Sequence, residues 1–467
     1  MSDLERFGYK QELKRAMSGY SSFALSFSVI SILTGGITLF SHGLAYGGPF
    51  AMTVGWPIVS AGTLLVAVAM AELASAFPTA GALYHWAHLL GGKGIGWLTA
   101  WLNLIGQVSV TAGVDYGCAK FLAVLVGSQR VLPIYAAILL SHALINHAGV
   151  RLVGWLNDLS ASVHMLGVAA LVCALVCFAP HVPARELLSR THLHDGSGAW
   201  LFFVALLQPL WTFTGFDASA HVAEETRDAA RRAPVAIISA VAVSAVFGYV
   251  LVVALLWAAP PGAWTALAGD DTAPLTIVTN ALGAHAGQLV MALVIAAMWF
   301  CGLASLTANS RMIFAFARDG GLPAACRTIS SRWRTPVVAI WVSASCALLL
   351  VAASLAVSDA AYMAVTSLST TALYLSYALP MGCGLWARTR WQRRGPFALG
   401  RASVPIALAA CVWLGAAAVL CMLPPNGVVG ITMISILLAL AAGYWMRART
   451  AFAGPQVSLA ALEDGPR

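Results

Sequence analysis

The chain has 467 residues, of which 60% are hydrophobic and only 9% are charged, and its mean hydropathy is +0.82. This composition lacks the polar surface of a soluble globular protein and predicts an integral membrane protein. The apolar runs are long and do not alternate, which excludes an outer-membrane barrel and requires helices that satisfy their own backbone groups. The formal net charge of +8 needs no nucleic acid partner, because the basic residues gather in loops on one side of the predicted membrane.

Twelve apolar segments predict twelve transmembrane helices. Their approximate ranges are 21–47, 50–77, 94–127, 133–150, 157–180, 198–222, 232–259, 281–317, 336–357, 361–387, 402–423 and 427–446. Most Lys and Arg residues flank these spans on the side that carries both termini, whereas Arg130, Arg185 and Arg190 fall on the other side. Since basic loops stay in the cytoplasm, we expect a multi-pass protein of the plasma (inner) membrane with both termini cytoplasmic.

The spans divide into two units of five and a remaining pair. The first unit covers 21–180, the second covers 198–387, and each opens with an interrupted helix. Because five is odd, the second unit must cross the membrane in the opposite orientation, which predicts an all-α fold with a 5+5 inverted repeat. We expect the last two spans, 402–446, at the periphery, with a cytoplasmic segment over 1–20 and a polar cytoplasmic tail over 450–467.

The first interruption lies in the stretch Ser31-Ile-Leu-Thr-Gly-Gly-Ile-Thr38. Thr34, Gly35 and Gly36 are expected to let the backbone leave helical geometry, which exposes amide donors and the positive end of the following half-helix. Such donors suit the carboxylate of a substrate. The alternative is that the glycine pair only permits close helix packing.

The second interruption, Trp211-Thr-Phe-Thr-Gly-Phe-Asp-Ala-Ser-Ala-His-Val222, places a carboxylate at mid-depth in an apolar span. Such a break is tolerable in hydrocarbon only where it faces protein or a watery cavity, and matching breaks in two halves indicate a transporter's substrate site. Carbonyls at the end of the first half-helix and aromatic faces offer partners to an ammonium, so the two breaks can bind both ends of a zwitterion. The predicted site residues on this span are Trp211, Phe213, Thr214, Gly215, Phe216 and Asp217.

Asp217 itself has two functional interpretations. It is either a proton carrier or a fixed counter-ion for a cationic substrate. The structural alternative is that its side chain only caps the second half-helix.

The third span carries Asn103, Gln107, Thr111 and Asp115 four residues apart, which forms a polar stripe on an otherwise apolar helix. We expect the stripe to line the central cavity and Gln107 to contribute to the substrate site. The alternative is ordinary hydrogen bonding between helices.

Two further spans carry polar candidates. On the eighth span Cys301, Ser305 and Asn309 share a face, and a sodium site built with carbonyls of the first span would need Ser305 or Thr307. His164 in the fifth span is an intramembrane ionisable group and the second candidate for ion coupling, although a lone His is more often a hydrogen-bonded packing residue.

Charged residues gather at the cytoplasmic ends of the helices. One interpretation is an inner gate of ion pairs that breaks and reforms during transport, and the alternative is solvated termini that complement helix dipoles. The residues are Glu72, Glu224, Glu225, Arg311, Arg318 and Asp319.

Nothing in the sequence predicts catalysis, a cofactor or a bound metal. There is no P-loop, so primary active transport by this chain alone is excluded. The Gly215-Phe-Asp217 run resembles an intramembrane aspartyl protease signature only superficially, because the second carboxylate that such an enzyme requires is missing.

Four runs of residues resemble the amino acid/polyamine/organocation (APC) transporter superfamily. They are Gly8 to Arg15, Ala71 to Trp86, Gly215 to Thr226 and Ser310 to Pro323. The third and fourth runs are similar to the amino acid/choline transporter family, whose members carry amino acids, γ-aminobutyrate, choline and related amines. The resemblance implies a leucine-transporter-like fold and alternating access around a central site.

The resemblance also implies roles for particular residues. It supports Ser31 to Ile37 as part of the substrate site, and it places Ser305 where relatives approach the substrate or a sodium ion. The second interruption is similar to the corresponding helix of arginine/agmatine antiporters, in which an acid occupies the position of Asp217. His164 lies near the position where some proton-coupled relatives carry a Lys in place of sodium.

The sequence therefore predicts a secondary transporter that imports an amino acid or a γ-aminobutyrate-like small amine by proton symport. The alternatives are an exchanger or carrier of choline, a polyamine or another organic cation, and coupling to sodium. A receptor-like sensor or a channel is the alternative from a different class. The expected partners are the small amine, a proton and the lipid bilayer, without nucleic acid, and the oligomeric state stays open.

Overall fold

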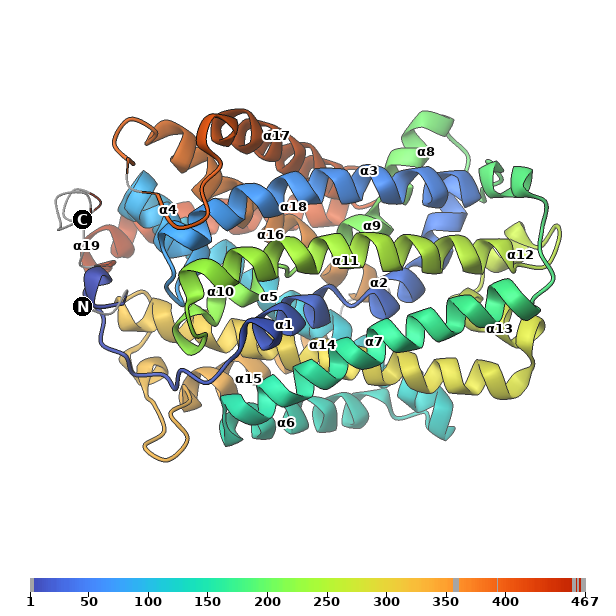
Figure 1. Cartoon of the computed structure of the whole chain (residues 1–467), viewed down its shortest axis with the longest axis horizontal. Coiled ribbons are helices and arrows are strands. Elements are labelled where there is room, and N and C mark those ends of the chain that lie inside the picture. The colour runs from blue at the N-terminus through green and yellow to red at the C-terminus, as the bar shows by residue number, and fades with distance from the viewer. Residues whose placement is uncertain (1–3, 356–360, 393, 456–458, 460–461, 463–467) are drawn as a thin grey trace.

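The computed structural model describes residues 4–355, 361–392, 394–455, 459 and 462 as an elongated bundle whose long helices run along its long axis (Figure 1). Within these residues, extended pairing is limited to an isolated bridge between Met17 and Thr226. The prediction of an all-α membrane protein is therefore confirmed. The predicted tail at 450–467 lies partly outside the described residues.

Ten helical segments of the described chain are long and apolar enough to span a membrane. The two predicted spans outside that set are the interrupted helix near 198–222 and α16 (Ala361–Trp386), so every predicted span has a helical counterpart. The other uninterrupted helices are α5 (Lys93–Val126), α6 (Val131–Ala148), α7 (Val150–Phe178), α11 (Ala229–Trp257), α14 (Ala284–Arg318), α15 (Val337–Leu355), α17 (Ser403–Met422) and α18 (Gly427–Gly443).

The two interrupted helices lie side by side in the bundle. The first consists of α1 (Gly19–Ile30) and α2 (Ile32–Thr38), and the second consists of α8 (Gly198–Ala205), α9 (Leu207–Thr212) and α10 (Ala218–His221). They run in opposite directions, with α2 packed on α9 and α1 packed on α10 (Figure 1). This antiparallel arrangement agrees with an inverted repeat, and the exact limits of the two five-helix units stay a prediction.

The first and second spans meet at Gly48, inside the element α3 (Phe40–Ala76). Gly48 has φ 63° and ψ −172°, so the helix axis breaks there, at the predicted boundary between the spans. The next residues are tied to the loop before α8, because the Phe50 amide donates to the Ser189 carbonyl at 2.9 Å.

The fifth span begins at Val150, seven residues before the predicted start at Asn157. Two polar residues, Asn157 and Asp158, lie inside this helix. Both are accommodated locally: Asn157 Nδ2 donates to the Val153 carbonyl at 2.8 Å, and Asp158 Oδ2 accepts from Ser21 Oγ at 3.1 Å.

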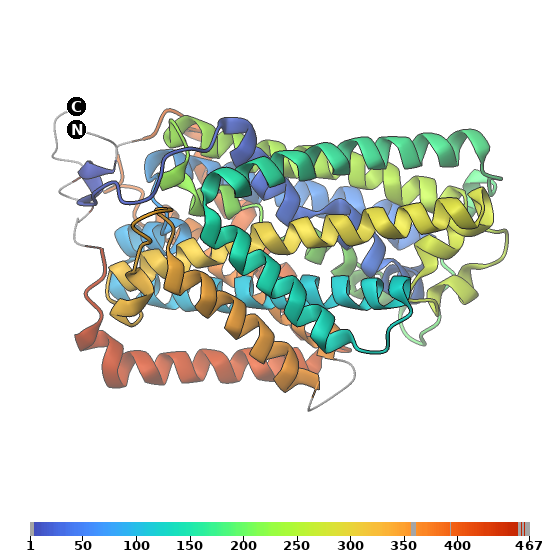
Figure 2. The ribbon, with the colours of Figure 1, turned by 90° about the horizontal axis from the view of Figure 1, so that it is seen from below.

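Burial separates central from peripheral helices. In its most apolar window the α1–α2 span is 89% buried within the protein, whereas the span that contains α18 is only 17% buried. The outer position of α18 is visible in Figure 2, where this red helix follows one edge of the bundle. This low burial agrees with the expected peripheral position of the last span.

Both terminal segments lie at the same end of the bundle (Figure 1). Leu4, Phe7 and Tyr9 of the N-terminal segment are buried there, as is Phe452 after α19 (Arg449–Ala451). The same end holds α4 (Ala82–Gly91), whereas α12 (Trp264–Ala268) and α13 (Ala273–Leu282) cover the opposite end. The N-terminal segment over 1–20 and the described part of the predicted tail are thus partly packed onto the bundle.

Candidate functional site

Ser31 makes the first interruption, with φ 41° and ψ 78°. The helix resumes at the next residue, and the amides of Thr34 and Gly35 donate to the Ser31 carbonyl at 2.9 and 3.0 Å. The prediction that Thr34 and the following glycine pair leave helical geometry is wrong, because these residues are helical parts of α2. Helix geometry instead leaves the amides of Ile32 and Leu33 without an intrahelical acceptor, so the predicted anion-binding end lies nearly one turn earlier.

Gly35 brings the two interrupted helices together. A Cβ atom at this position would overlap Thr212 Oγ1 of α9, so glycine allows the close approach of α2 and α9. The Gly36 carbonyl adds a contact by accepting a hydrogen bond from Gln208 Nε2 at 3.2 Å. The packing alternative therefore accounts for Gly35, and Ile37 on the same short helix is buried as well.

A polar cluster holds the first interruption in place. Ser31 Oγ lies 2.6 Å from Thr34 Oγ1 and 2.9 Å from His164 Nε2, while His164 Nδ1 lies 2.9 Å from the Ser160 carbonyl. Because a carbonyl only accepts, Nδ1 donates, and a neutral His164 then accepts the Ser31 hydroxyl at Nε2. This geometry gives His164 a positioning role for Ser31, and its predicted part in ion coupling stays a prediction.

Gly215 makes the second interruption, with φ 79°. A Cβ atom here would overlap Val29 Cγ1 of α1, so both the backbone conformation and the contact with the first interrupted helix favour glycine. Ser26 of α1 bridges the break: its hydroxyl donates to the Phe216 carbonyl and accepts from the Ser219 amide, each at 2.9 Å. The second break is therefore built by contacts between the two interrupted helices.

The carbonyls at the end of α9 are partly occupied. Tyr374 Oη donates to the Leu210 carbonyl at 2.8 Å, and Thr214 Oγ1 donates to the Trp211 carbonyl at 2.8 Å. The prediction that this helix end offers unpaired carbonyls is wrong for these two, because neighbouring hydroxyl groups reach them.

The predicted aromatic residues are buried. Phe213 packs on Trp56, with ring centroids 5.3 Å apart, and Trp211 is 4% exposed. Phe216 lies 5.1 Å from the ring of Tyr377. Phe213 is therefore a packing residue in this closed arrangement, whereas Phe216 adjoins the tyrosine that binds Asp217.

Asp217 lies at the centre of a buried hydrogen-bond network. Its Oδ1 accepts from Tyr377 Oη at 2.7 Å, and its Oδ2 accepts from Asn103 Nδ2 at 3.3 Å and Gln107 Nε2 at 3.4 Å. The side chain makes no capping bond to α10, so the capping alternative is wrong. All four side chains are fully buried, which closes the network to water on both sides.

His221, one turn beyond Asp217, completes the network. Its Nε2 lies 3.1 Å from Asp217 Oδ2, and its Nδ1 lies 3.3 Å from the Ala80 carbonyl. His221 therefore joins Asp217 to the Ala80 carbonyl.

Sequence reasoning missed Tyr377 and His221. The i+4 spacing of Asp217 and His221 on one helix face was an available signal. Tyr377 comes from α16, 160 positions away in the chain, and no local pattern indicates that α16 packs beside the second interruption.

The polar stripe on α5 divides among three partners. Asn103 and Gln107 reach Asp217, Thr111 Oγ1 lies 2.8 Å from Ser305 Oγ, and Asp115 meets a histidine on α6. The stripe thus connects the second interruption with the predicted site residue Ser305.

The remaining polar residues on α14 point to other helices. Cys301 Sγ donates to the Val29 carbonyl at 3.2 Å, Thr307 Oγ1 donates to Asn146 Oδ1 at 2.9 Å, and Asn309 Nδ2 donates to a serine on α15 at 2.7 Å. Thr307 is thus directed at Asn146, as Ser305 is at Thr111, and the sodium site predicted for either hydroxyl group stays a prediction.

Two ion pairs follow the second interruption toward the end that carries both termini. Arg311 Nε and Nη2 donate to the two oxygens of Glu225 at 3.0 and 3.2 Å, and both side chains are fully buried. Arg318 donates to both oxygens of Glu224 at 3.0 and 2.9 Å. These pairs join α14 to the segment after α10, as the gate interpretation requires.

Glu72, predicted with the same group, lies elsewhere. Its carboxylate accepts hydrogen bonds from the Leu399 amide, at 3.1 Å, and from the Ser403 hydroxyl. It therefore anchors the connection before α17.

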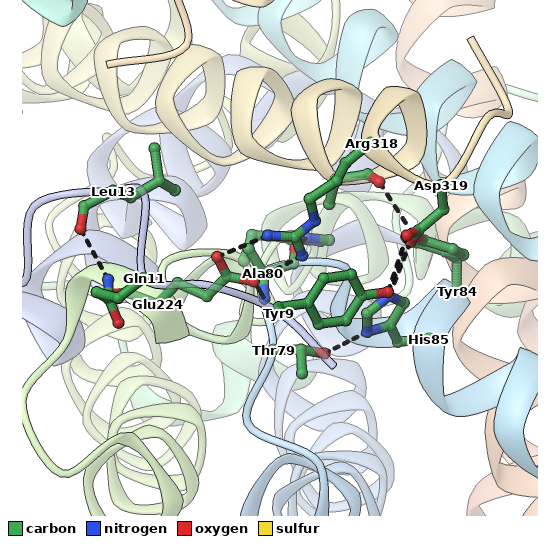
Figure 3. Close-up of polar contacts among 12 residues, drawn as sticks. Tyr9, Gln11, Leu13, Thr79, Ala80, Tyr84, His85, Glu224, Arg318 and Asp319 are labelled. Atoms are coloured by element: carbon green, nitrogen blue, oxygen red, sulfur yellow. Dashed lines mark hydrogen bonds and ion pairs between the residues drawn. The ribbon is translucent and has the colours of Figure 1, made fainter. Parts of the chain in front are cut away.

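Asp319 organises a third contact at this end, and Figure 3 shows how Tyr9 reaches it from the N-terminal segment. Tyr9 Oη donates to Asp319 Oδ1 at 2.9 Å, His85 Nε2 lies 3.0 Å from Oδ2, and Tyr84 also donates to this carboxylate. The Arg318 guanidinium lies 3.8 Å from the centre of the Tyr9 ring. The N-terminal segment is thus bound across the ion pairs.

Burial changes the acidity of this cluster. Desolvation raises the pKa of Asp319 to about 7, although the Tyr9 hydroxyl opposes the shift. Desolvation and then the charge of Arg318 lower the pKa of His85. Both shifts favour the uncharged forms of the two groups.

Comparison with known proteins supports one assignment. A family model described as amino acid permease matches residues 18–444. The chain is 36% identical over 458 residues to the amino-acid permease BAT1 homolog of Oryza sativa subsp. japonica, a match that covers 90% of this chain and 87% of that protein. It is 33% identical over 493 residues to the amino-acid permease BAT1 of Arabidopsis thaliana, covering 97% and 95%. It is 28% identical over 438 residues to the GABA-specific permease of Saccharomyces cerevisiae, covering 89% and 76%.

Antiparallel interrupted helices around a buried polar centre define a multi-pass membrane protein of the transporter type. Within that class, the chain belongs to the amino acid permease family, and the resemblance to the APC superfamily is confirmed. Membership of this family implies a transporter of amino acids rather than an enzyme.

Proposed function

We propose that the protein imports an amino acid or a γ-aminobutyrate-like small amine by proton symport with alternating access. The observation that carries the proposal is the environment of Asp217. Its carboxylate lies at a helix break, fully buried, and is held by the hydroxyl of Tyr377 and the amides of Asn103 and Gln107. Hydrogen-bond donors of this kind fix the orientation of a buried carboxylate, which suits it to bind an ammonium group.

The substrate amine would take the place of His221 beside Asp217. In the structure His221 Nε2 lies 3.1 Å from Asp217 Oδ2, one turn away on the same helix face. The carboxylate end of a zwitterion would meet the first amides of α2 and the Ser31 hydroxyl. The substrate would then join the two interrupted helices.

The ion pairs Arg311–Glu225 and Arg318–Glu224 would form the inner gate. They lie beyond the second interruption, and Tyr9 of the N-terminal segment stacks on Arg318 of the second pair. Release to the inside would require these pairs to separate. The gate would face the cytoplasm, in a protein of the plasma (inner) membrane whose termini are both cytoplasmic.

Relatives support an amine substrate. The similarity to the GABA-specific permease of Saccharomyces cerevisiae and to the two amino-acid permeases covers most of this chain. Asp217 and His164 are the proposed coupling residues from sequence, and sodium in place of the proton is the alternative to be tested with them.

Counterflow in proteoliposomes tests the proposed function. Vesicles containing purified protein are loaded with unlabelled γ-aminobutyrate, L-alanine, choline or putrescine, and exchange for the labelled compound is measured at equal pH. We expect saturable counterflow for an amine zwitterion, its loss in Asp217→Asn, and wild-type counterflow in Asp158→Asn, a control carboxylate on α7. Equal flux without any counter-substrate would indicate a channel and contradict the proposal.

An organic cation is the second candidate substrate. The rings of Phe216 and Tyr377 beside the Asp217 carboxylate are a suitable set for a quaternary ammonium group. Choline counterflow without counterflow of either zwitterion would favour this candidate.

Coupling is tested by replacing the driving gradient. Uptake driven by an inside-alkaline pH gradient in sodium-free buffer is expected for the wild type. The same uptake in His164→Ala would contradict the proposed role of His164 in proton coupling. Uptake that requires sodium at equal pH would identify sodium, in place of the proton, as the coupling ion.

A further inference from the structure

A second intramembrane carboxylate lies on α5, outside the site described above. Asp115 Oδ2 is 3.1 Å from His142 Nδ1 on α6, and both side chains are fully buried. Gly302 of α14 borders the pair on a third side, because a Cβ atom there would overlap Asp115 Oδ1. Three membrane-spanning helices thus enclose an Asp–His pair.

The residues around Asp115 and His142 provide them with few hydrogen bonds or opposite charges. Within the described residues, Asp115 Oδ1 and His142 Nε2 have no hydrogen-bond partner. The titratable groups that face Asp115 are Cys118, Tyr135 and Cys301. Each of these three donates to a backbone carbonyl, at 3.5, 2.8 and 3.2 Å respectively, instead of donating to Asp115. No Lys or Arg in the described part of the chain forms an ion pair with Asp115.

The two intramembrane carboxylates therefore differ in kind. Asp217 is held by Tyr377, Asn103 and Gln107 in addition to its histidine, whereas Asp115 has only one N–H donor. An ionised Asp115 beside a neutral imidazole would leave a poorly solvated net charge inside the membrane, which is strongly unfavourable. The enclosed pair is stable when it holds one further proton, either as acid with imidazole or as carboxylate with imidazolium.

Symport of an amine requires such a second group. A carboxylate that binds the ammonium of the substrate cannot hold a coupling proton at the same time, because proton and amine compete for the same oxygen atoms. Competition at Asp217 alone would produce exchange of amine for proton. Cotransport in one direction needs a protonatable group that stays separate from the amine while both are bound.

The position of Asp115 satisfies this requirement. Thr111 is one turn away, about 6 Å along α5, and its hydroxyl meets Ser305 of the predicted substrate site at 2.8 Å. Gln107, one further turn along, contacts Asp217. Water that enters the substrate site after release of the amine would therefore come within one helical turn of Asp115.

We infer that Asp115 and His142 form a proton-binding site that carries the coupling proton, separate from the amine site at Asp217. The inference rests on the proposed proton symport and assigns it to this pair. In the outward-facing state the pair takes one proton from the outer aqueous phase. In the inward-facing state water reaching the pair through the empty substrate site solvates the ionised carboxylate, and one proton leaves to the inside.

The test separates substrate exchange from proton coupling in the full-length protein. Proteoliposomes containing the wild type, Asp115→Asn, His142→Gln or the control Asp158→Asn are assayed with labelled γ-aminobutyrate and L-alanine. Counterflow is measured at equal pH, and accumulation is measured under an inside-alkaline gradient. One-proton symport of a zwitterion accumulates substrate by about tenfold per pH unit of gradient.

We expect Asp115→Asn and His142→Gln to keep counterflow and to lose this roughly tenfold accumulation, whereas Asp158→Asn keeps both. Asp115→Glu, which retains a carboxylate, should restore gradient-driven accumulation. Accumulation at the wild-type level in both Asp115→Asn and His142→Gln would overturn the inference and leave proton symport intact. Loss of both counterflow and accumulation in a monodisperse variant would also overturn it, since the pair would then serve substrate binding. A wild type that exchanges amines but ignores the pH gradient would overturn the proposed symport itself.

Discussion

Replacing Glu225 with Gln removes the charge that balances a fully buried guanidinium. Arg311 loses the charged partner of two bonds, at 3.0 and 3.2 Å, of which the remaining oxygen of Gln can accept one. It keeps its bonds from Nη1 to Asn146 Oδ1 and Ser310 Oγ, both at 3.0 Å. Removing one partner of a buried pair costs about 3–5 kcal/mol, and the two remaining acceptors place the expected cost near 3 kcal/mol. That cost shifts the equilibrium between closed and open inner gates by roughly 100-fold.

Cysteine accessibility measures the shift. Ala80 is fully buried beside Glu224, so a cysteine placed there reports opening through its rate of labelling by a membrane-impermeant maleimide, read by peptide mass spectrometry. We expect roughly 100-fold faster labelling in Glu225→Gln. The effect of Glu224→Gln should be smaller, because its partner Arg318 is 11% exposed. Labelling at the wild-type rate in Glu225→Gln would refute the argument that this pair holds the gate closed.

Three further predictions address separate contacts. Tyr377→Phe removes the 2.7 Å hydrogen bond to Asp217. It should weaken binding of γ-aminobutyrate by about tenfold or more in calorimetric titration, because a hydrogen bond to a charged group contributes about 1.5–3 kcal/mol. Unchanged affinity would show that this hydrogen bond takes no part in substrate recognition. Gly215→Ala forces a side chain into φ 79° and against Val29, so the thermal unfolding temperature should fall by the equivalent of about 1–3 kcal/mol. Adding Val29→Ala should recover only the steric part, and full recovery would argue against backbone strain. The raised pKa of Asp319, about 7 against an ordinary 3.8, means that its stabilising contribution is present at low pH and is lost as the pH rises through about 7. Asp319→Asn should therefore flatten this decline in thermal stability, and an unchanged slope would contradict the assignment.

Sequence reasoning located both interrupted helices because a break in an apolar span must bring polar or flexible residues with it. It misplaced the first break by attributing it to Gly35 and Gly36. The flexibility of these glycines indicates a helix break less reliably than their small size indicates close helix packing. Gly35 serves helix packing, and Ser31 adopts the left-handed conformation, supported by Thr34 and His164. A serine in that role has no distinctive local pattern.

The partners of the acidic residues were less predictable than the acids themselves. Asp217 and Asp115 stand out as carboxylates in apolar spans, but Tyr377 and His142 reach them only through packing of α16 and α6 against α5 and the second interruption. One sequence contains no record of such packing. The choice between a counter-ion and a proton carrier depended on these partners, so it could be argued only from the structure.

The charged residues at the end that carries both termini illustrate the same limit. Their clustering predicted a gate, yet the sequence could not separate Glu72, which anchors the connection before α17, from Glu224 and Glu225, which pair with arginines. It also gave no indication that Tyr9 crosses the gate, because a short amphipathic segment has many possible binding surfaces.

Direct binding of a labelled amine to the purified protein tests the central claim, that the carboxylate of Asp217 recognises the substrate. We predict saturable binding of γ-aminobutyrate or L-alanine to the wild type and to Asp158→Asn. Affinity should be at least about tenfold lower in an Asp217→Asn variant of unchanged thermal stability. Equal affinity in wild type and Asp217→Asn would contradict the account.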